Sequence, residues 1–165
     1  MTTPEGKVKQ WLAYRMAKRF GHLAMWEYAP PGGPFGQNGT ADRLYLIESG
    51  NETVEHLYEE HGRPTGVLVL IEAKAVYANG VANQPTSLQL KRLREIDKAG
   101  GVAATLIGKD LAKLDRIFQE IDRRRDLNRG AWLLSIQNAE YISALMDYAK
   151  NTPNDYLKDL KWGSV

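Results

Sequence analysis

Cysteine is absent from the 165 residues of this chain. Its absence excludes disulfides, zinc sites built on thiolates and cysteine nucleophiles, and it fits a reducing compartment. No apolar run approaches the roughly 20 residues of a membrane-spanning helix, and the N-terminal residues lack the basic-then-apolar order of a secretion signal. We therefore expect a soluble, cytoplasmic protein that does not contact a membrane.

The chain also lacks a strong excess of charge of one sign. Its 22 Lys and Arg residues nearly balance its 20 Asp and Glu residues, which leaves a net charge of +2. Overall charge therefore gives no argument for nucleic-acid binding, which must be argued from local clusters. The length suffices for one domain with a real core and a smaller appendage.

Hydrophobic periodicity predicts one helix followed by three strands in the first half of the chain. The helix begins at the capping hydroxyl of Thr3 and ends at Gly21. A dense run of Pro and Gly over residues 30–39 predicts a loop, and the polar residues 49–66 are expected to join two strands as a long hairpin. The strands are predicted over residues 22–29, 43–48 and 67–74.

A second helix and a fourth strand are predicted next. Thr86 and Gln89 match a capping box, and the helix that follows should run to about Ala99 and bury Leu90 and Leu93. Two glycines end this helix before a buried strand over residues 102–107. Residues 1–108 should therefore form an α/β (α+β) domain of the order α-β-β-β-α-β, with a central sheet flanked by helices.

Residues 109–165 are predicted to form a helical extension that packs on this core or makes a dimer contact. One charged helix is expected over residues 110–126 and another over residues 132–150. An apolar stripe on the second of these helices is built from Ile142, Leu145, Met146 and Ala149. Such a stripe more often belongs to a core, but it can also build a homodimer.

The most informative segment is the end of the third strand, where Glu72 and Lys74 follow the apolar run 67–71. Side chains alternate along a strand, so these two residues point to the same face, beside Leu68 and Leu70. Burying an acid and a base is costly unless they pair or hold a metal ion. The pair therefore indicates a functional site, although an exposed pair at a fraying strand end is the alternative.

Asp42 precedes the neighbouring strand and is expected to lie beside this pair. If residues 43–48 and 67–74 form an antiparallel hairpin, the start of the first strand lies next to the end of the second. Two carboxylates would then converge beside a lysine, and such hard oxygen ligands suit Mg²⁺ or Mn²⁺. The alternative for Asp42 taken alone is a simple turn residue.

The ordered set of these motifs resembles the PD-(D/E)XK nuclease superfamily, and its VRR-NUC branch in particular. The similar motifs are residues 39–44 (GTADRL), 71–74 (IEAK) and 86–89 (TSLQ), within a resemblance that covers roughly residues 4–107. Ala41 departs from the proline that the family often has at this place, which would only stiffen the turn.

The resemblance implies a restriction-endonuclease-like core and a divalent-metal-dependent DNA endonuclease. Its substrates would include branched DNA such as Holliday junctions or flaps, its products would carry 5′-phosphates, and it would act in the cytoplasm of a bacterium or a phage-infected host. A homodimer would supply two active sites for a junction. The alternatives are a nuclease-fold protein that binds DNA without cleaving it, and a factor that engages host proteins.

Catalytic roles follow from the chemistry and from the resemblance together. Asp42 and Glu72 would bind the metal ion with the Ala73 carbonyl as a third ligand, and Lys74 would orient a water molecule or stabilise the transition state. Gln89 would lie near the substrate phosphate at a helix start, although it also completes the capping box.

Glu5 and several basic residues complete the set of predicted site residues. In the resembled family an acid on the first helix can assist the metal, and Glu5 is the candidate, although an acid there also complements the helix dipole. Basic residues are solvated helix faces by default, but on a nuclease they become candidates for phosphate contacts. The predicted DNA-binding residues are Arg123, Arg124, Arg125, Lys91 and Arg92.

Overall fold

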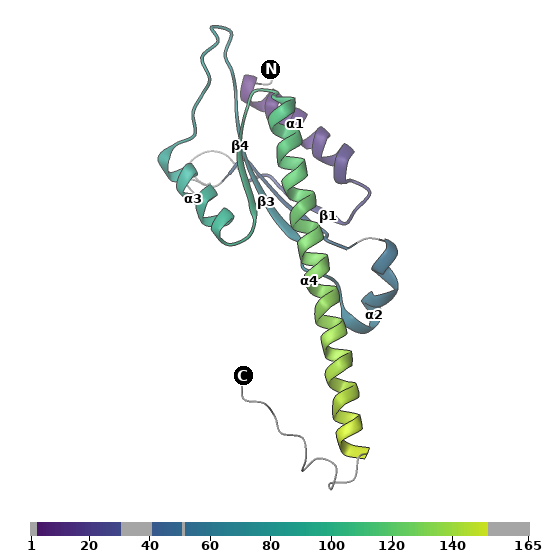
Figure 1. Ribbon diagram of the computed structural model, residues 1–165. Coiled ribbons are helices and arrows are strands. Elements are labelled where there is room, and N and C mark those ends of the chain that lie inside the picture. Colours follow the sequence, from purple (N-terminus) through teal and green to yellow (C-terminus); the bar gives the residue numbers. More distant parts are fainter. Residues whose placement is uncertain (1–2, 31–40, 51, 152–165) are drawn as a thin grey trace. The chain divides into compact units, whose positions relative to one another are not determined.

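The structure is a computed structural model that describes residues 3–30, 41–50 and 52–151 (Figure 1). Contacts between residues divide the chain into two compact units, one ending at Arg129 and the other beginning at Gly130. Nearly all of the predicted loop over residues 30–39 lies outside the described residues. So does the tail from residue 152 onward.

The first unit contains the elements predicted for residues 1–108, in the predicted order. A 3₁₀ helix and a short α-helix are inserted between the second and third strands. The elements are α1 (Pro4–Phe20), β1 (Met25–Tyr28), β2 (Arg43–Ile47), η1 (Glu52–Leu57), α2 (Tyr58–His61), β3 (Val67–Lys74), α3 (Ser87–Lys98) and β4 (Val102–Ile107), followed by the start of α4 (Leu111–Asn151).

The four strands form one mixed sheet of order β1-β2-β3-β4. β2 pairs antiparallel with both β1 and β3, whereas β3 and β4 run parallel. The expected hairpin is confirmed, since Arg43 of β2 faces Ile71 of β3. The parallel connection from β3 to β4 passes through α3, as parallel strands require a crossover.

The predicted boundaries of α1 are also confirmed. The Thr3 hydroxyl accepts a hydrogen bond from the Gly6 N–H at 3.1 Å and caps the helix. Pro4 occupies the first turn, where a missing N–H costs nothing. One side of the helix is buried at helical spacing, through Val8, Leu12, Met16 and Phe20.

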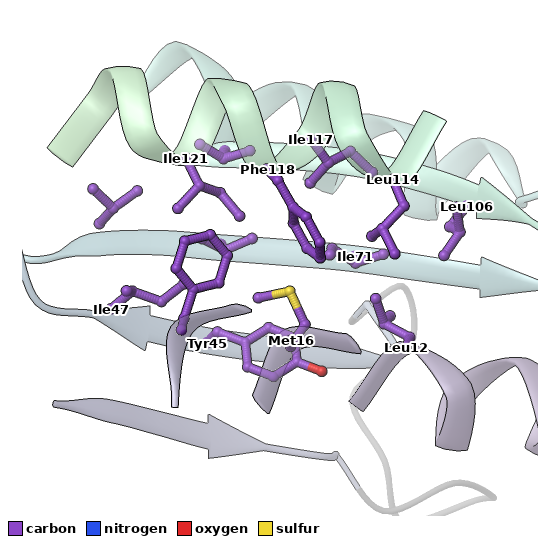
Figure 2. Packing of buried hydrophobic residues seen from close by; sticks show 14 residues of the cluster. Leu12, Met16, Tyr45, Ile47, Ile71, Leu106, Leu114, Ile117, Phe118 and Ile121 are labelled. Atoms are coloured by element: carbon purple, nitrogen blue, oxygen red, sulfur yellow. The ribbon is translucent and has the colours of Figure 1, made fainter. Parts of the chain in front are cut away.

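One face of the sheet carries the main hydrophobic core. Figure 2 shows side chains of α4 and α1 packed against those of the strands. The Phe20 and Phe118 rings meet edge to face, with centroids 5.4 Å apart. The cluster includes Leu12, Met16, Tyr45, Ile47, Val69, Ile71, Leu106, Leu114, Ile117 and Ile121. The first part of α4 therefore belongs to the core, and the boundary predicted at residue 108 falls inside the first unit.

The opposite face of the sheet is covered in part by α3. A small cluster there joins Leu70 of β3 and Leu93 of α3 with Ala41. The expectation that Leu90 would also be buried is wrong, because its side chain is 40% exposed. Leu90 and Leu93 line one surface pocket against Ala103 of β4, and of the two only Leu93 is buried.

The prediction of two helices after residue 109 is wrong, because α4 is one continuous helix of 41 residues. It starts where expected, since the Asp110 carboxylate accepts a hydrogen bond from the Lys113 N–H at 2.9 Å. Gly130 does not interrupt it, because an internal glycine costs only about 1 kcal/mol relative to alanine and no proline is nearby. No helix among the described residues is long and apolar enough to cross a membrane.

Candidate active site

Glu72 is the centre of the candidate site, and its side chain is fully buried at the end of β3. Its Oε1 atom lies 2.5 Å from the Lys74 Nζ atom and accepts a hydrogen bond of 2.5 Å from the Gln89 amide. Lys74 is itself buried, with a side-chain exposure of 9%. The alternative of an exposed, fraying pair is therefore excluded, and the two charges are compensated inside the protein.

Gln89 is held against Glu72 by the first turn of α3. Its side-chain oxygen accepts a hydrogen bond from the Thr86 N–H at 2.8 Å, and the Thr86 hydroxyl accepts one from the Gln89 N–H at 3.2 Å. The predicted capping box is thus confirmed. The side-chain NH₂ remains available to reach Glu72, so Gln89 both caps the helix and contacts the buried carboxylate.

Asp42 precedes β2 and Glu72 lies near the end of β3, so the hairpin register places them at the same end of the two strands. The Asp42 Oδ2 atom accepts a hydrogen bond from the Ala73 N–H at 2.9 Å. The N–H and C=O of one strand residue point to the same side, so the Ala73 carbonyl is also directed toward Asp42. The carbonyl of Lys74 accordingly points the other way and accepts a hydrogen bond from the Gly108 N–H at 2.7 Å.

Lys9 is a member of the site that sequence reasoning missed. Its ammonium lies 2.6 Å from Asp42 Oδ1 and 2.9 Å from Glu5 Oε1. The sequence signal was the spacing of four residues between Glu5 and Lys9, which places them on one side of a helix. Its contact with Asp42 depends on tertiary packing, and the default reading of Lys9 as a solvated residue was wrong. Glu5 is thus linked to Asp42 through Lys9.

Two titrating groups of the site have shifted pKa values. Burial raises the pKa of Glu72, and the nearby Asp42 carboxylate adds to this rise, although the hydrogen bond from Lys74 opposes it. Burial alone would lower the pKa of Lys9, but its hydrogen bonds and charge interactions with Asp42 and Glu5 outweigh burial and raise it.

The residues present fit a divalent metal ion that uses two carboxylates and a backbone carbonyl. The buried Oε2 atom of Glu72 has no hydrogen-bond partner within the described structure, which is rare for a buried oxygen and is consistent with a site for an ion or a water molecule. Asp42 and the Ala73 carbonyl offer the other hard oxygen donors. In the described ranges, no three Asp, Glu or His side chains are grouped to hold a metal ion, so Glu5 is not brought to Asp42 and Glu72 as a direct third carboxylate.

Comparison with models of protein families, with curated proteins and with solved structures finds no match to this chain.

The three consecutive arginines predicted to bind DNA lie at the other end of the sheet. The Arg125 guanidinium donates to the Glu48 carbonyl at 2.7 Å and to the Gly50 carbonyl at 3.4 Å. Asp42 precedes β2 and Glu48 follows it, so at about 3.3 Å per residue the two positions are roughly 20 Å apart. Arg125 therefore holds the chain that leaves β2, far from the buried carboxylate.

The other two arginines of this cluster are paired with Glu120. Arg123 makes two hydrogen bonds to its carboxylate, at 2.7 and 2.6 Å, and Arg124 makes one at 2.8 Å. The hydrogen bonds from Arg123 and Arg124 lower the pKa of Glu120 to about 2, against the opposing effect of burial.

Lys91 and Arg92 are nearer to the candidate site, because both follow Gln89 in α3. Their side chains are exposed by 67% and 56% and pair with Glu95 at 3.9 and 2.8 Å. Exposed pairs of this kind are weak. These two residues are therefore better placed than Arg123–Arg125 to contact a substrate that approaches Glu72.

The raised pKa of Glu72 predicts that stability without metal depends on pH. The folded protein binds a proton at Glu72 more readily than the unfolded chain, whose reference pKa is 4.5. The contribution of this group to the free energy of unfolding is thus present below pH 4.5 and is lost as pH rises through its raised pKa. In Glu72→Gln, the free energy of unfolding should no longer fall over this pH range, which urea denaturation at a series of pH values measures. The exposed control Glu59→Gln should follow the parent protein, and a parallel response of both variants would contradict the assignment.

Proposed function

We propose that this protein is a divalent-metal-dependent DNA endonuclease that hydrolyses phosphodiester bonds. The observation that supports it best is the buried Glu72 carboxylate, held through one oxygen by Lys74 and Gln89 while its other oxygen has no hydrogen-bond partner in the described structure. Buried carboxylate oxygens normally have a hydrogen-bond partner. An unpartnered oxygen beside Asp42 and the Ala73 carbonyl suits a magnesium or manganese ion, which prefers oxygen ligands.

Each residue of the site has a role in this proposal. Asp42, Glu72 and the Ala73 carbonyl would hold the metal ion, which would lower the pKa of a bound water and neutralise charge on the phosphate. Lys74 stabilises negative charge that develops on the phosphate, since its ammonium is fixed by Glu72 and needs little reorganisation. Gln89 keeps the Glu72 carboxylate in one orientation by hydrogen bonding to Oε1.

The substrate in this proposal is DNA, including branched DNA such as flaps and four-way junctions. Support for a phosphate substrate comes from α3, whose N-terminus and Gln89 lie beside Glu72. A helix N-terminus favours phosphate, and the exposed Lys91 and Arg92 on the next turn add positive charge.

The direct test is a cleavage panel of linear, nicked, flap and four-way DNA, each with and without Mg²⁺. We expect metal-dependent cleavage that leaves 5′-phosphates, which a ligase can rejoin at a nick. Asp42→Asn should abolish cleavage, whereas the matched control Asp97→Asn, at an exposed position of α3, should cleave like the parent. Cleavage by Asp42→Asn at the parent's rate would overturn the site assignment.

A second candidate is a nuclease-fold protein that binds DNA without cleaving it. The observation that favours this candidate is the Lys9 ammonium, which pairs with both Asp42 and Glu5 and offsets part of their negative charge without a metal ion. Salt-sensitive DNA binding with no cleavage in Mg²⁺ or Mn²⁺ would support it. Absence of any DNA binding at low salt would instead favour a factor that engages host proteins.

Lys9→Met should increase the affinity of the site for Mn²⁺ by about tenfold or more. The variant removes a resident positive charge from two carboxylates, and charges a few ångströms apart interact by more than 1.4 kcal/mol even near a protein surface. Isothermal titration calorimetry without DNA measures the change. Lys7→Met, on an exposed position of the same helix, is the control and should leave Mn²⁺ affinity unchanged. Equal affinities for the Lys9 variant and the parent would show that Lys9 does not compete with the metal.

A further inference from the structure

The distal half of α4, residues 130–151, exposes an unusual amount of apolar surface. Leu134 is 57% exposed, Tyr141 66% and Leu145 47%. Ile142 and Met146, from the predicted apolar stripe, are each 56% exposed. Contiguous exposed apolar surface on a protein marks an interaction site more often than it occurs by chance.

Three of these side chains, Leu134, Tyr141 and Leu145, fall on one series of positions spaced alternately by three and four. This spacing is the heptad pattern of helices that pack along their length. The preceding residue in the same series is Leu127, one heptad before Leu134. The seam in this half of the helix consists of Ala131, Leu134, Asn138, Tyr141 and Leu145.

Charged residues are kept away from this seam. Residues 130–151 contain only three, namely Glu140, Asp147 and Lys150. With 3.6 residues per turn, all three lie on the side of the helix away from Asn138. The positions that flank the seam are Gly130, Ser135, Gln137, Ile142 and Ala144, all uncharged, so a second identical helix would meet no like charge.

We propose that this seam binds a second copy of the chain and forms a two-helix coiled coil about a two-fold axis. Asn138 lies near the middle of the seam, so an axis passing there brings the two Asn138 side chains together in either helix orientation. An amide is both donor and acceptor, so it can pair with its own copy. In coiled coils, a polar residue at one seam position fixes the register and the number of helices. A two-fold interface requires a surface that is complementary to itself, and the pairing of Asn138 with its own copy meets this requirement.

The dimer is independent of the nuclease proposal, because the seam includes no residue of the candidate active site. Its test is the mass in solution, measured without DNA or metal by light scattering during size-exclusion chromatography. We expect twice the 18.5 kDa mass of the chain. If the parent protein is a monomer at every protein concentration measured, the dimer proposal is wrong, whatever the cleavage activity of the protein.

Paired variants test the position of the interface. Leu134→Glu with Leu145→Glu puts charges into the apolar seam and should give a monomer. Ser143→Glu with Lys150→Glu adds the same number of carboxylates on the other side and should remain a dimer. Dimers from both variants would show that the interface lies elsewhere.

Cross-linking provides a second measurement that does not depend on destabilising the helix. The chain has no cysteine, so Asn138→Cys introduces a single thiol at the proposed axis. Mild oxidation should convert most of this variant to a covalent dimer, whereas Ser143→Cys should remain mostly monomeric on denaturing gels. Equal cross-linking of both variants would contradict the proposed register.

Discussion

Lys74→Met should lower the free energy of unfolding by about 3–5 kcal/mol, the cost of removing one partner from a buried ion pair. The Lys74 side chain is 9% exposed and the Glu72 side chain is completely buried, so the carboxylate left behind would have no access to water. Gln89 would remain as its hydrogen-bond donor, but a neutral amide does not compensate the charge. Urea denaturation without metal at neutral pH measures the loss.

The double variant Glu72→Gln/Lys74→Met should recover most of this loss. Replacing both partners of a buried ion pair by uncharged side chains of similar size removes the uncompensated charge, and Gln89 remains to hydrogen-bond the new amide at position 72. Lys91→Met is the control, because Lys91 is 67% exposed and lies 3.9 Å from its partner, and it should change stability by no more than about 0.5 kcal/mol. A double variant as unstable as Lys74→Met would mean that the pair is not the source of the effect.

The same variants separate folding from catalysis. Lys74→Met should reduce cleavage by about 10²–10³-fold, as expected when a preorganised group that stabilises transition-state charge is removed. The double variant should regain stability but not cleavage, because it lacks a metal-binding carboxylate as well as the lysine. If cleavage returned together with stability, Glu72 and Lys74 would be structural residues, and the proposed function would lose its main support.

Leu114→Ala should destabilise the first unit by about 2–5 kcal/mol, the range for removing a large side chain from a well-packed core. Leu114 is fully buried, and it belongs to the same cluster as Leu12 and Leu106. Because it lies beyond residue 108, this effect tests whether the start of α4 is part of the core or an appendage. Thermal and urea denaturation of the full chain measure it.

Leu111→Ala provides a matched control on the same helix. Leu111 is 49% exposed, so its truncation should change the free energy of unfolding by no more than about 0.5 kcal/mol. Equal effects of the two substitutions would indicate that α4 does not pack on the sheet as described.

Local signals predicted most of the first unit correctly. Capping residues and an apolar period determine where α1 and α3 begin, because those interactions lie within one turn of helix. The apolar run of β3 and the order of the strands were sufficient to predict that Asp42 would lie beside Glu72. In both cases the decisive contacts are close in sequence or follow from the alternation of a single hairpin.

The continuity of α4 and the partners of its arginines were not visible in the sequence. Gly130 lies between two helical patterns, and sequence reasoning treated that region as a break, although one glycine cannot stop a long helix. Arg125 was selected for its place in a basic cluster, but its guanidinium holds backbone carbonyls 77 and 75 residues away in the chain. Charge clustering in sequence carries no information about such partners.

The sequence by itself determined the elements of the first unit and the meeting of Asp42, Glu72 and Lys74, since these follow from the alternation and register of one hairpin. Only the tertiary structure decided that Glu72 is fully buried with one unpartnered oxygen, and that Lys9 crosses from α1 to neutralise Asp42. Burial and long-range pairing are properties of how elements pack, and packing depends on side chains far apart in the sequence.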